Sequence, residues 1–377
     1  MTVVAPPSEP RNVMLVTTEL RAGGTERCVT ELATRLDPEK YNCEVVCLAP
    51  FPTERMQFYE RLREQQVSLS SLNARSAFDF FRAKRRLAQR IQSQNPAAVL
   101  SFLFHANVLT GVTLKKFPRV PHIGNIRVAD PRSWRLPLER RSLQHARNVI
   151  CVSHSVRDYC QFKGHYPENR LSVIPNGVDH TAIETQIRHP VRPEGFRESS
   201  GPHVGFVGRL DSQKGLDRLI AYWPKLRSQF PNASLWIAGD GPQAKSLAGQ
   251  GKALGLEACI HWLGWRAQPW ALLEHCDAFV FPSKWEGMSN ALLEGMATGK
   301  AIVANMIEGV SEVLGPGPAC QLAEVRQPET LVANLCQVLQ DPEVRSRCGH
   351  FNRDRVLRNY SIEGMVGQFE SAIEGVI

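Results

Sequence analysis

The sequence lacks any uninterrupted apolar run long enough to cross a bilayer, so no membrane-spanning helix is expected. Its first twelve residues also lack the charged start and long apolar core of a secretion signal. Ten cysteines are present, but they form no C-x-x-C pair and no His/Cys cluster at zinc-like spacing. Several, such as Cys47 and Cys151, lie in apolar runs, which favours buried, reduced thiols. We therefore expect a cytoplasmic protein, either free or peripheral on the inner face of the membrane.

Three kinds of short motif are also missing. No Asp-x-Asp occurs in the sequence, so nothing indicates a metal-bridged diphosphate, and no metal ligand is predicted. The first loop reads RAGGTER rather than G-x-G-x-x-G, which argues against a nicotinamide-dependent oxidoreductase. None of the usual nucleic-acid recognition motifs appears, and the aromatic residues do not interleave with the basic ones. We therefore expect no metal, no cofactor and no nucleic-acid partner.

The positive charge is concentrated in the first half of the chain. The whole sequence carries a net charge of +8, and residues 1–180 hold 26 Lys and Arg against 16 Asp and Glu. The remainder holds 19 against 21 and is slightly acidic. A half this basic indicates an anionic partner, for which an anionic membrane surface or a phosphate-bearing lipid acceptor is the favoured interpretation.

Short apolar runs alternate with amphipathic stretches along the whole chain, which is typical of an α/β protein with parallel sheets. At 377 residues, two domains are expected. We place the first domain at residues 1–180, a polar linker rich in Pro and Gly at 181–201, the second domain at 202–360 and a last helix at 361–377.

The stretch 277–305 predicts an anion site. Its apolar run Ala278–Phe281 predicts a buried strand, and a loop then leads to a helix that begins near Ser289, a candidate cap. The amide groups at the start of such a helix suit a diphosphate. Glu286 lies in the loop and Glu294 in the helix, and carboxylates suit sugar hydroxyls better than phosphate. The alternative is a pair of solvated acids, because two glutamates at this spacing are common by chance.

A cationic loop follows the predicted strand 203–207, in the string GRLDSQKG. Gly208 allows the backbone to approach a ligand closely. Arg209 and Lys214 place two cations at the carboxyl end of the strand, where they can neutralise a leaving diphosphate. The alternative is that both side chains are merely solvated.

The first domain contains further candidates. Gly23 and Gly24 precede a predicted helix and permit a close backbone approach to a ligand, although a plain turn is the alternative. His105 follows the strand at 97–104 and can be either a base or a hydrogen-bonded structural residue. Arg127 ends another strand and suits a phosphate or carboxylate, and the alternative is a surface arginine.

Residues 78–92 predict a basic amphipathic helix. Phe78, Phe81, Ala88 and Ile91 recur at roughly helical spacing among five arginine and lysine residues. One interpretation rests this helix on anionic lipid. The other packs it on a sheet as an ordinary covering helix with a solvated charged face.

Several ordered motifs resemble the large family of retaining glycosyltransferases known as family four, which has the GT-B fold. They are GGTERCVTELA near the start, LSVIPNGVD before the linker, GRL…KG, GDGP and the Glu-x7-Glu that begins in PSKWEGMSN. The resemblance covers nearly the whole chain. It implies two Rossmann-like, doubly wound domains facing a central cleft, with the last helix packed back on the first domain. The first domain would bind the acceptor and the second the nucleotide sugar.

The resemblance also implies roles for the residues of the second domain. Glu286 would lie beside the transferred sugar, and Glu294 would bind the ribose hydroxyls. Arg209 and Lys214 would hold the donor phosphates and, with Glu286, are the expected catalytic residues. The remaining expected donor-binding residues are Gly24, Gly264, Gly287, Met288, Ser289 and Asn290.

On the acceptor side, the expected residues are Gly23, His105 and Arg127. Many members of the family carry a histidine at the strand end where Asn125 and Arg127 stand here, so this chain departs from the pattern at that position.

The expected reaction is a metal-independent, retaining transfer of a hexosyl or N-acetylhexosaminyl group. The group would pass from a nucleotide-diphosphate sugar to a hydroxyl of a glycan or polyprenyl- or lipid-linked acceptor, in the synthesis of a cell-surface polysaccharide or glycolipid. A UDP-sugar is favoured over a GDP-sugar as the donor, while the sugar and acceptor stay open. The alternative is a sugar-nucleotide epimerase of the same fold, which would turn over without an acceptor.

Overall fold

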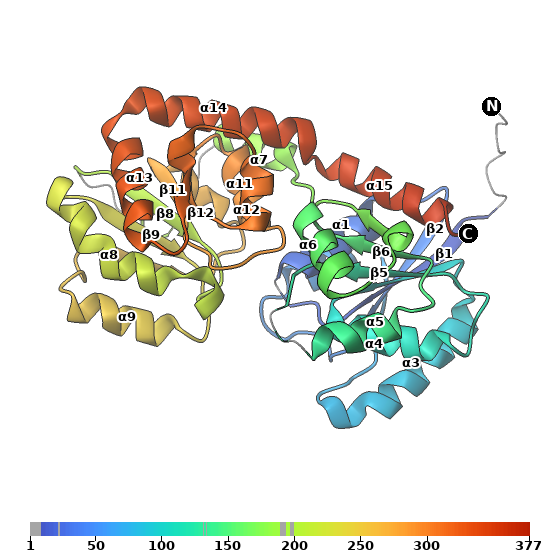
Figure 1. Ribbon diagram of the computed structural model, residues 1–377. Coiled ribbons are helices and arrows are strands. Elements are labelled where there is room, and N and C mark those ends of the chain that lie inside the picture. The colour runs from blue at the N-terminus through green and yellow to red at the C-terminus, as the bar shows by residue number, and fades with distance from the viewer. Residues whose placement is uncertain (1–8, 22, 131, 133, 189–193, 197–199) are drawn as a thin grey trace. The chain divides into compact units, whose positions relative to one another are not determined.

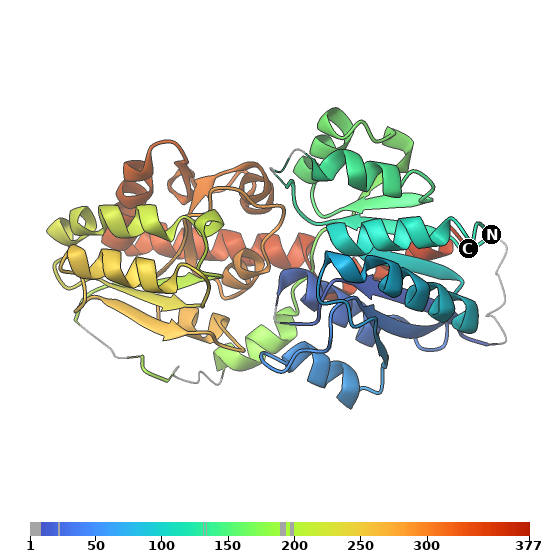
Figure 2. The same ribbon diagram turned by 90° about the horizontal axis from the view of Figure 1, so that it is seen from below.

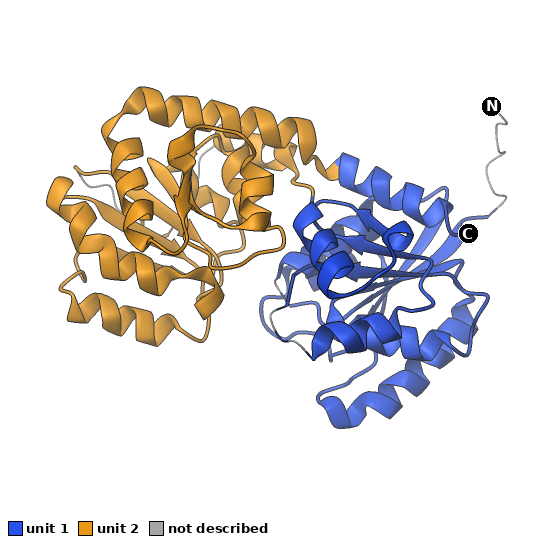
Figure 3. Cartoon of the chain, viewed as in Figure 1, with its two compact units in different colours: residues 1–176, 363–377 blue, residues 177–362 orange. Residues whose placement is uncertain are grey.

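The computed structural model describes residues 9–21, 23–130, 132, 134–188, 194–196 and 200–377. The chain divides into two compact units (Figure 3). Unit 1 comprises residues 1–176 and 363–377, and unit 2 comprises residues 177–362. The last helix of the sequence thus belongs to the unit formed by the first part of the chain.

The described residues of unit 1 form a seven-stranded parallel sheet in the order β3-β2-β1-β4-β5-β6-β7. The strand order reverses at β1 and β4, which are neighbours although two strands separate them in the sequence. The strands are β1 (Arg11–Thr17), β2 (Tyr41–Cys47), β3 (Ser68–Ser71), β4 (Ala98–Phe102), β5 (His122–Ile126), β6 (Asn148–Cys151) and β7 (Leu171–Val173).

Helices cover both faces of this sheet (Figures 1 and 2). Helices α3, α4 and α5 pack side by side along one face, and α1 and α15 lie along the other. The helices of this unit are α1 (Gly24–Arg35), α2 (Gln57–Glu64), α3 (Phe80–Gln94), α4 (Phe104–Leu114), α5 (Arg135–Ser142), α6 (His154–Asp158) and α15 (Ile362–Glu374), the last of which begins at the unit boundary.

Unit 2 has a six-stranded parallel sheet in the order β10-β9-β8-β11-β12-β13, which reverses between β8 and β11. Its strands are β8 (His203–Val207), β9 (Ser234–Ala238), β10 (Ile260–Gly264), β11 (Ala278–Phe281), β12 (Ala301–Met306) and β13 (Leu322–Glu324). Its helices are α7 (His180–Arg188), α8 (Leu216–Gln229), α9 (Ala244–Ala253), α10 (Trp270–Glu274), α11 (Asn290–Ala297), α12 (Glu308–Leu314), α13 (Pro328–Gln340) and α14 (Pro342–Asn359). The fold is α/β with two Rossmann-like units, as expected from the sequence.

The central strands form because their residues are apolar on both faces of the sheet, and both faces are covered. Every residue of β4, β8, β9 and β11 is buried. In unit 1, α15 contributes to the same core: Phe369 is fully buried, and its ring centroid lies 6.2 Å from that of Phe102 on β4. The backbone N–H of Asp37 also donates to Glu370 Oε1 on α15 (2.9 Å).

The cysteines are free thiols, and all are buried except Cys43, which is partly buried. No helix in the described part of the chain has the length and apolar content needed to span a bilayer.

Two expectations about local structure are wrong. The helix expected at residues 78–92 does not bury Phe78 and Phe81, which are 97% and 81% exposed. Helix α3 begins only at Phe80, and the face that packs on the sheet consists of Ala83, Leu87 and Ile91. The polar stretch placed in a linker also contains a helix, α7, whose buried Ile183 gives it an apolar contact face.

Candidate functional site

The two loops with the strongest sequence signals lie at the point where the order of the unit 2 sheet reverses. One follows β8 and carries Arg209 and Lys214, and the other follows β11 and carries Glu286. Ligands of open α/β sheets bind outside the carboxyl ends of the strands at such a reversal, because successive connections leave toward opposite faces of the sheet. The topology therefore brings together two segments that are about 70 residues apart in the sequence.

An ion pair joins these two loops. Lys214 Nζ contacts Glu286 Oε1, and the side chains of the two residues are only 14% and 9% exposed. The ammonium group also lies 5.3 Å from the centroid of the Phe281 ring, on the last residue of β11. The charges of this pair are thus largely shielded from solvent, which strengthens their interaction.

Neutral polar groups hold the pair in place. Ser283 Oγ donates to Glu286 Oε1 (3.0 Å), and Gln213 Nε2 donates to the carbonyl oxygen of Trp285 (2.8 Å). The backbone N–H of Lys284 donates in turn to the carbonyl oxygen of Gln213 (2.7 Å). The sequence reasoning did not find Gln213 or Ser283, because single polar residues in a loop have no recognisable spacing.

The loop after β11 is also supported from behind. Asn305 Nδ2, on β12, donates to the carbonyl oxygens of Pro282 (2.7 Å) and Ser283 (3.1 Å). On α12, a Cβ at Gly309 would lie 2.1 Å from the carbonyl oxygen of Gly287, so only glycine allows this close approach. These supports make the loop a fixed part of the unit 2 fold.

Helix α11 begins where this loop ends. Asn290 is its first residue, and Glu294, one turn later, is 4% exposed. Ser289 occupies the N-cap position, but the prediction that its side chain caps the helix is wrong, since it makes no such bond with the described residues. Its backbone angles (φ −91°, ψ 124°) differ from those of Ser153 (φ −156°, ψ 163°), whose hydroxyl does cap α6, and so its hydroxyl is directed elsewhere.

The other expected donor residues are more exposed or more distant in the sheet. The side chain of Arg209 is 71% exposed, and its Nε atom lies 3.6 Å from Asp211 Oδ2. Gly264 ends β10, two strands away from β8, with a left-handed φ of +70°. Met288 is buried in the loop before α11.

In unit 1, the expected acceptor residues follow strands at the equivalent reversal. Gly23 and Gly24 begin α1 after β1, His105 follows β4, and Arg127 follows β5. Gly23 is the N-cap of α1 in an extended conformation (φ −164°). Ala22, which precedes it, lies outside the described residues.

Arg127 is not the surface arginine that the sequence left as an alternative. It is 8% exposed, and Nη2 donates a hydrogen bond to Asn176 Oδ1. Its Nη1 atom is buried and has no hydrogen-bond partner in the described part of the chain. Such a group favours an anion as an additional partner.

His105 is exposed at the start of α4. Partial burial, followed by the charges of Arg135 and Arg132, lowers the pKa of its imidazole from the ordinary value of 6.5. The ring is therefore neutral at physiological pH and can accept a proton.

A buried glutamate beside Gly23 escaped the sequence reasoning. Glu26 is 6% exposed, and one of its carboxylate oxygens would lie 2.2 Å from a Cβ at Gly23, so the side chain folds back over the glycine turn. Burial raises the pKa of this carboxyl to about 7. The string GGTER contained the signal, because a glutamate three residues after an N-cap commonly reaches back toward it.

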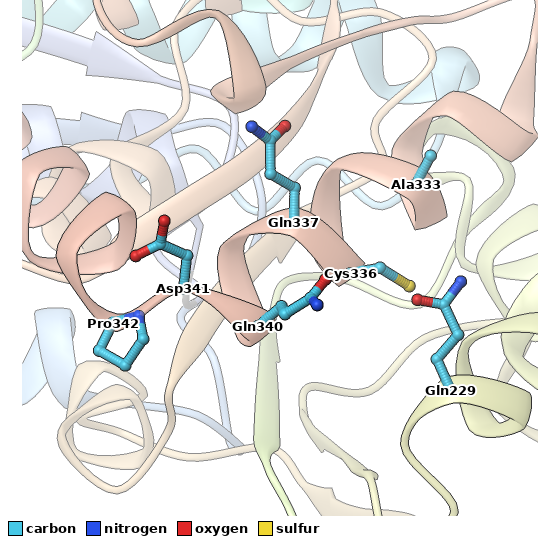
Figure 4. Close-up of a pocket in the computed structure, with 7 residues that line it drawn as sticks. All are labelled: Gln229, Ala333, Cys336, Gln337, Gln340, Asp341 and Pro342. Atoms are coloured by element: carbon cyan, nitrogen blue, oxygen red, sulfur yellow. The ribbon is translucent and has the colours of Figure 1, made fainter.

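A surface depression of about 620 Å³ lies elsewhere on unit 2 (Figure 4). It is lined by the end of α8, the last turns of α13 and the start of α14, including Gln229, Cys336 and Gln340. Helix α8 begins next to the Lys214 loop and ends at Gln229, about 20 Å along its axis. This depression is therefore separate from the candidate site.

Two family descriptions match consecutive parts of the chain. Residues 22–182 match Glycosyltransferase Family 4, and residues 190–355 match Glycosyl transferases group 1. Among curated relatives, glycogen synthase of Mycobacterium tuberculosis is 30% identical over 193 residues, covering 50% of this chain and 45% of the relative. The lipopolysaccharide core biosynthesis glycosyltransferase LpsD of Rhizobium meliloti is 29% identical over 233 residues, covering 57% of this chain and 66% of the relative. The chain thus aligns with less than half the length of the first of these relatives.

Solved structures share the fold over almost the whole chain. Anabaena Alr3699/HepE in complex with UDP-glucose superposes with a TM-score of 0.82 at 18% identity, covering 97% of this chain and 100% of that one. Sucrose-phosphate synthase from Thermosynechococcus elongatus gives 0.78 at 17% identity, covering 97% and 98%. The two family matches, the two Rossmann-like sheets and these structures agree, and the chain belongs to the family 4 glycosyltransferases of GT-B fold.

Proposed function

We propose that the protein transfers a hexosyl or N-acetylhexosaminyl group from a nucleotide-diphosphate sugar, with UDP favoured as the nucleotide, to a hydroxyl group. The observation that carries this proposal is the shielded Lys214–Glu286 pair at the reversal of the unit 2 sheet, in front of α11. It supplies one cation for a diphosphate and one carboxylate for a sugar within a single contact. The HepE structure, whose title includes UDP-glucose, supports this choice of donor.

The donor would be held by groups of unit 2. Arg209, Lys214 and the amides of Gly287–Asn290 would bind the diphosphate and stabilise its charge as it leaves, so no metal is required for that role. Glu294 would bind the ribose, and Glu286 the transferred sugar. The acceptor hydroxyl would attack from the face that the diphosphate leaves, which retains the configuration of the anomeric carbon.

The acceptor would bind to unit 1, at Gly23, His105 and Arg127. We infer that it is a glycan or a polyprenyl- or lipid-linked glycan, used in the synthesis of a cell-surface polysaccharide or glycolipid. The printed activities of two relatives support this class: LpsD acts in lipopolysaccharide core biosynthesis, and the human relative is a phosphatidylinositol N-acetylglucosaminyltransferase subunit. The buried Arg127 supplies a cation suited to a phosphate on such an acceptor.

We also propose that the protein acts in the cytoplasm, bound peripherally to an anionic membrane. Phe78 and Phe81 are highly exposed at the start of α3, next to the exposed Arg82 and Arg85. The nearby Asp79 is engaged with Arg82 and with the backbone N–H groups of Arg75 and Ser76. Exposed aromatic rings surrounded by arginine suit the interface of an anionic bilayer.

A panel of nucleotide sugars tests the donor proposal. UDP-glucose, UDP-N-acetylglucosamine and GDP-mannose are compared by their effect on the melting temperature, since a ligand of the folded state must raise it. We expect stabilisation by a UDP-sugar, in the presence of EDTA, that is lost in the Glu294→Ala variant. Stabilisation by none of the three, or only with divalent ions, would contradict the proposal.

The donor that binds is then used to measure the reaction itself. Transfer to a lipid extract, followed by proton NMR of the product, determines whether the anomeric configuration is retained. Turnover without any acceptor would instead favour the epimerase alternative.

A further inference from the structure

The connection from β4 to α4 in unit 1 has an unusual backbone. Leu103 adopts φ +72° and ψ 158°, a combination that side-chain-bearing residues rarely occupy. Such conformations persist only where the surrounding structure imposes them, and they concentrate at functional sites. Here the turn places Phe104 and His105 at the carboxyl edge of the sheet, beside the residues that follow β5.

An aromatic cluster stands directly after this turn. The ring of Trp134 meets that of Phe104 edge to face, at a centroid distance of 5.4 Å, and the Phe104 ring meets His105 at 5.2 Å. The guanidinium of Arg135 lies 4.7 Å from the Phe104 centroid and 5.4 Å from that of Trp134. Three neighbours therefore fix the environment of Trp134, yet this residue remains 58% exposed.

The same cluster carries an excess of positive charge. Asp130 accepts hydrogen bonds from Arg132 Nε (2.8 Å) and Nη2 (2.6 Å) and from Arg135 Nη1 (3.0 Å). Tyr159 donates to the Asp130 carbonyl oxygen (2.6 Å) and anchors this segment from a different part of the chain. One carboxylate thus orients two guanidinium groups, and the side chain of Arg132 is 56% exposed.

We propose that Trp134, Phe104, Arg132 and Arg135 form an acceptor subsite for a sugar that bears an anionic group. The apolar face of the sugar ring would stack on the exposed indole of Trp134, and its phosphate or carboxylate would bind Arg132, oriented by Asp130. A rigid aromatic ring next to fixed guanidinium groups suits this combination better than either a neutral sugar or a free anion. This inference rests on the proposed function and names the chemistry of its acceptor.

Fluorine NMR of protein labelled with 5-fluorotryptophan tests the subsite directly. The Trp134→Phe variant identifies the Trp134 signal, and saturating UDP occupies the donor site so that sugar phosphates do not compete there. We expect glucose 1-phosphate or glucuronate to shift this signal saturably, at concentrations at least tenfold lower than glucose or inorganic phosphate alone. The comparison of glucose 1-phosphate with glucuronate shows whether a phosphate or a carboxylate is preferred.

The variant Arg132→Gln should weaken this binding at least tenfold, whereas Arg119→Gln, an exposed arginine of the same unit, should leave it unchanged. A silent Trp134 signal at millimolar ligand, or equal shifts with glucose, would overturn the subsite. Because UDP binding is measured separately by the melting temperature, failure of UDP to bind would count against the proposed function instead.

Discussion

At the scale of single residues, Lys214 and Glu286 place opposite charges in contact where we propose that a diphosphate binds. A shielded pair of this kind contributes little net stability, because desolvation of the two charges offsets their attraction. Removing one partner is costly, since the other charge then stays shielded without compensation. The pair is therefore better explained by ligand binding than by stability.

The Lys214→Met variant should lose donor binding and also unfold more easily, by about 2 to 3 kcal/mol, because Glu286 keeps an uncompensated charge. The double variant Lys214→Met/Glu286→Gln should recover most of this loss in urea unfolding but no transferase activity. A double variant as unstable as the single one would show that the pair is structural. Lys252→Met, on the exposed surface of the same unit, is the control.

Glu139 predicts a dependence of stability on pH. Burial raises the pKa of this carboxyl to about 7 from its ordinary value of 4.5, although a hydrogen bond from Asn107 Nδ2 (2.7 Å) acts in the other direction. Between these pH values the unfolded chain releases a proton that the folded chain keeps. Stability from this group is therefore complete below pH 4.5 and is lost as the pH rises to about 7.

The Glu139→Gln variant keeps an acceptor for Asn107 but cannot ionise. We expect it to be more stable than the natural chain at pH 8, by about 2 to 3 kcal/mol, and equally stable near pH 4.5. Melting temperatures at both pH values check this, with the exposed Glu60→Gln as control. An equal change at the two pH values would contradict the shifted pKa.

The sequence predicted the charged members of the donor site but not the residues that hold them. Glu286 and Lys214 were found because they follow apolar strands in recognisable strings. Gln213 and Asn305 act through single hydrogen bonds to backbone groups of a distant loop, a relationship that only the folded sheet creates. The carboxyl of Glu26 was missed for a related reason, since its burial depends on tertiary packing.

At the scale of elements, the strands were predictable because parallel strands buried on both faces are continuous apolar runs. Helix α3 was predictable in place but not in orientation. Its buried face is set by Ala83, Leu87 and Ile91, and the more hydrophobic Phe78 and Phe81 point to solvent. Hydrophobicity alone therefore selected the wrong face.

The exposed start of α3 makes membrane binding testable. Substitution of Phe78 and Phe81 by serine should leave the melting temperature nearly unchanged, because neither side chain is buried. It should reduce sedimentation with vesicles containing anionic phosphatidylglycerol by about tenfold or more, a loss that added salt would not restore. Equal sedimentation of variant and natural chain, or equal binding to neutral phosphatidylcholine vesicles, would contradict the proposal.

At the scale of the whole molecule, α15 belongs to unit 1 although unit 2 precedes it in the sequence. The Phe369→Ala variant should destabilise unit 1 by about 3 to 5 kcal/mol, because it opens a cavity against Phe102. Donor binding should persist, since the Lys214 and Glu286 loops lie in unit 2. Calorimetry with and without UDP checks both statements, and joint loss of stability and UDP binding would show that the donor site depends on unit 1.

The position of α15 also has a consequence for biosynthesis. A ribosome must complete the second sheet before it supplies the helix that closes the core of the first, so the nascent first sheet waits with Phe102 uncovered. Folding during translation therefore cannot proceed strictly one domain at a time. The waiting sheet would offer chaperones a hydrophobic surface for as long as the intervening residues are being made.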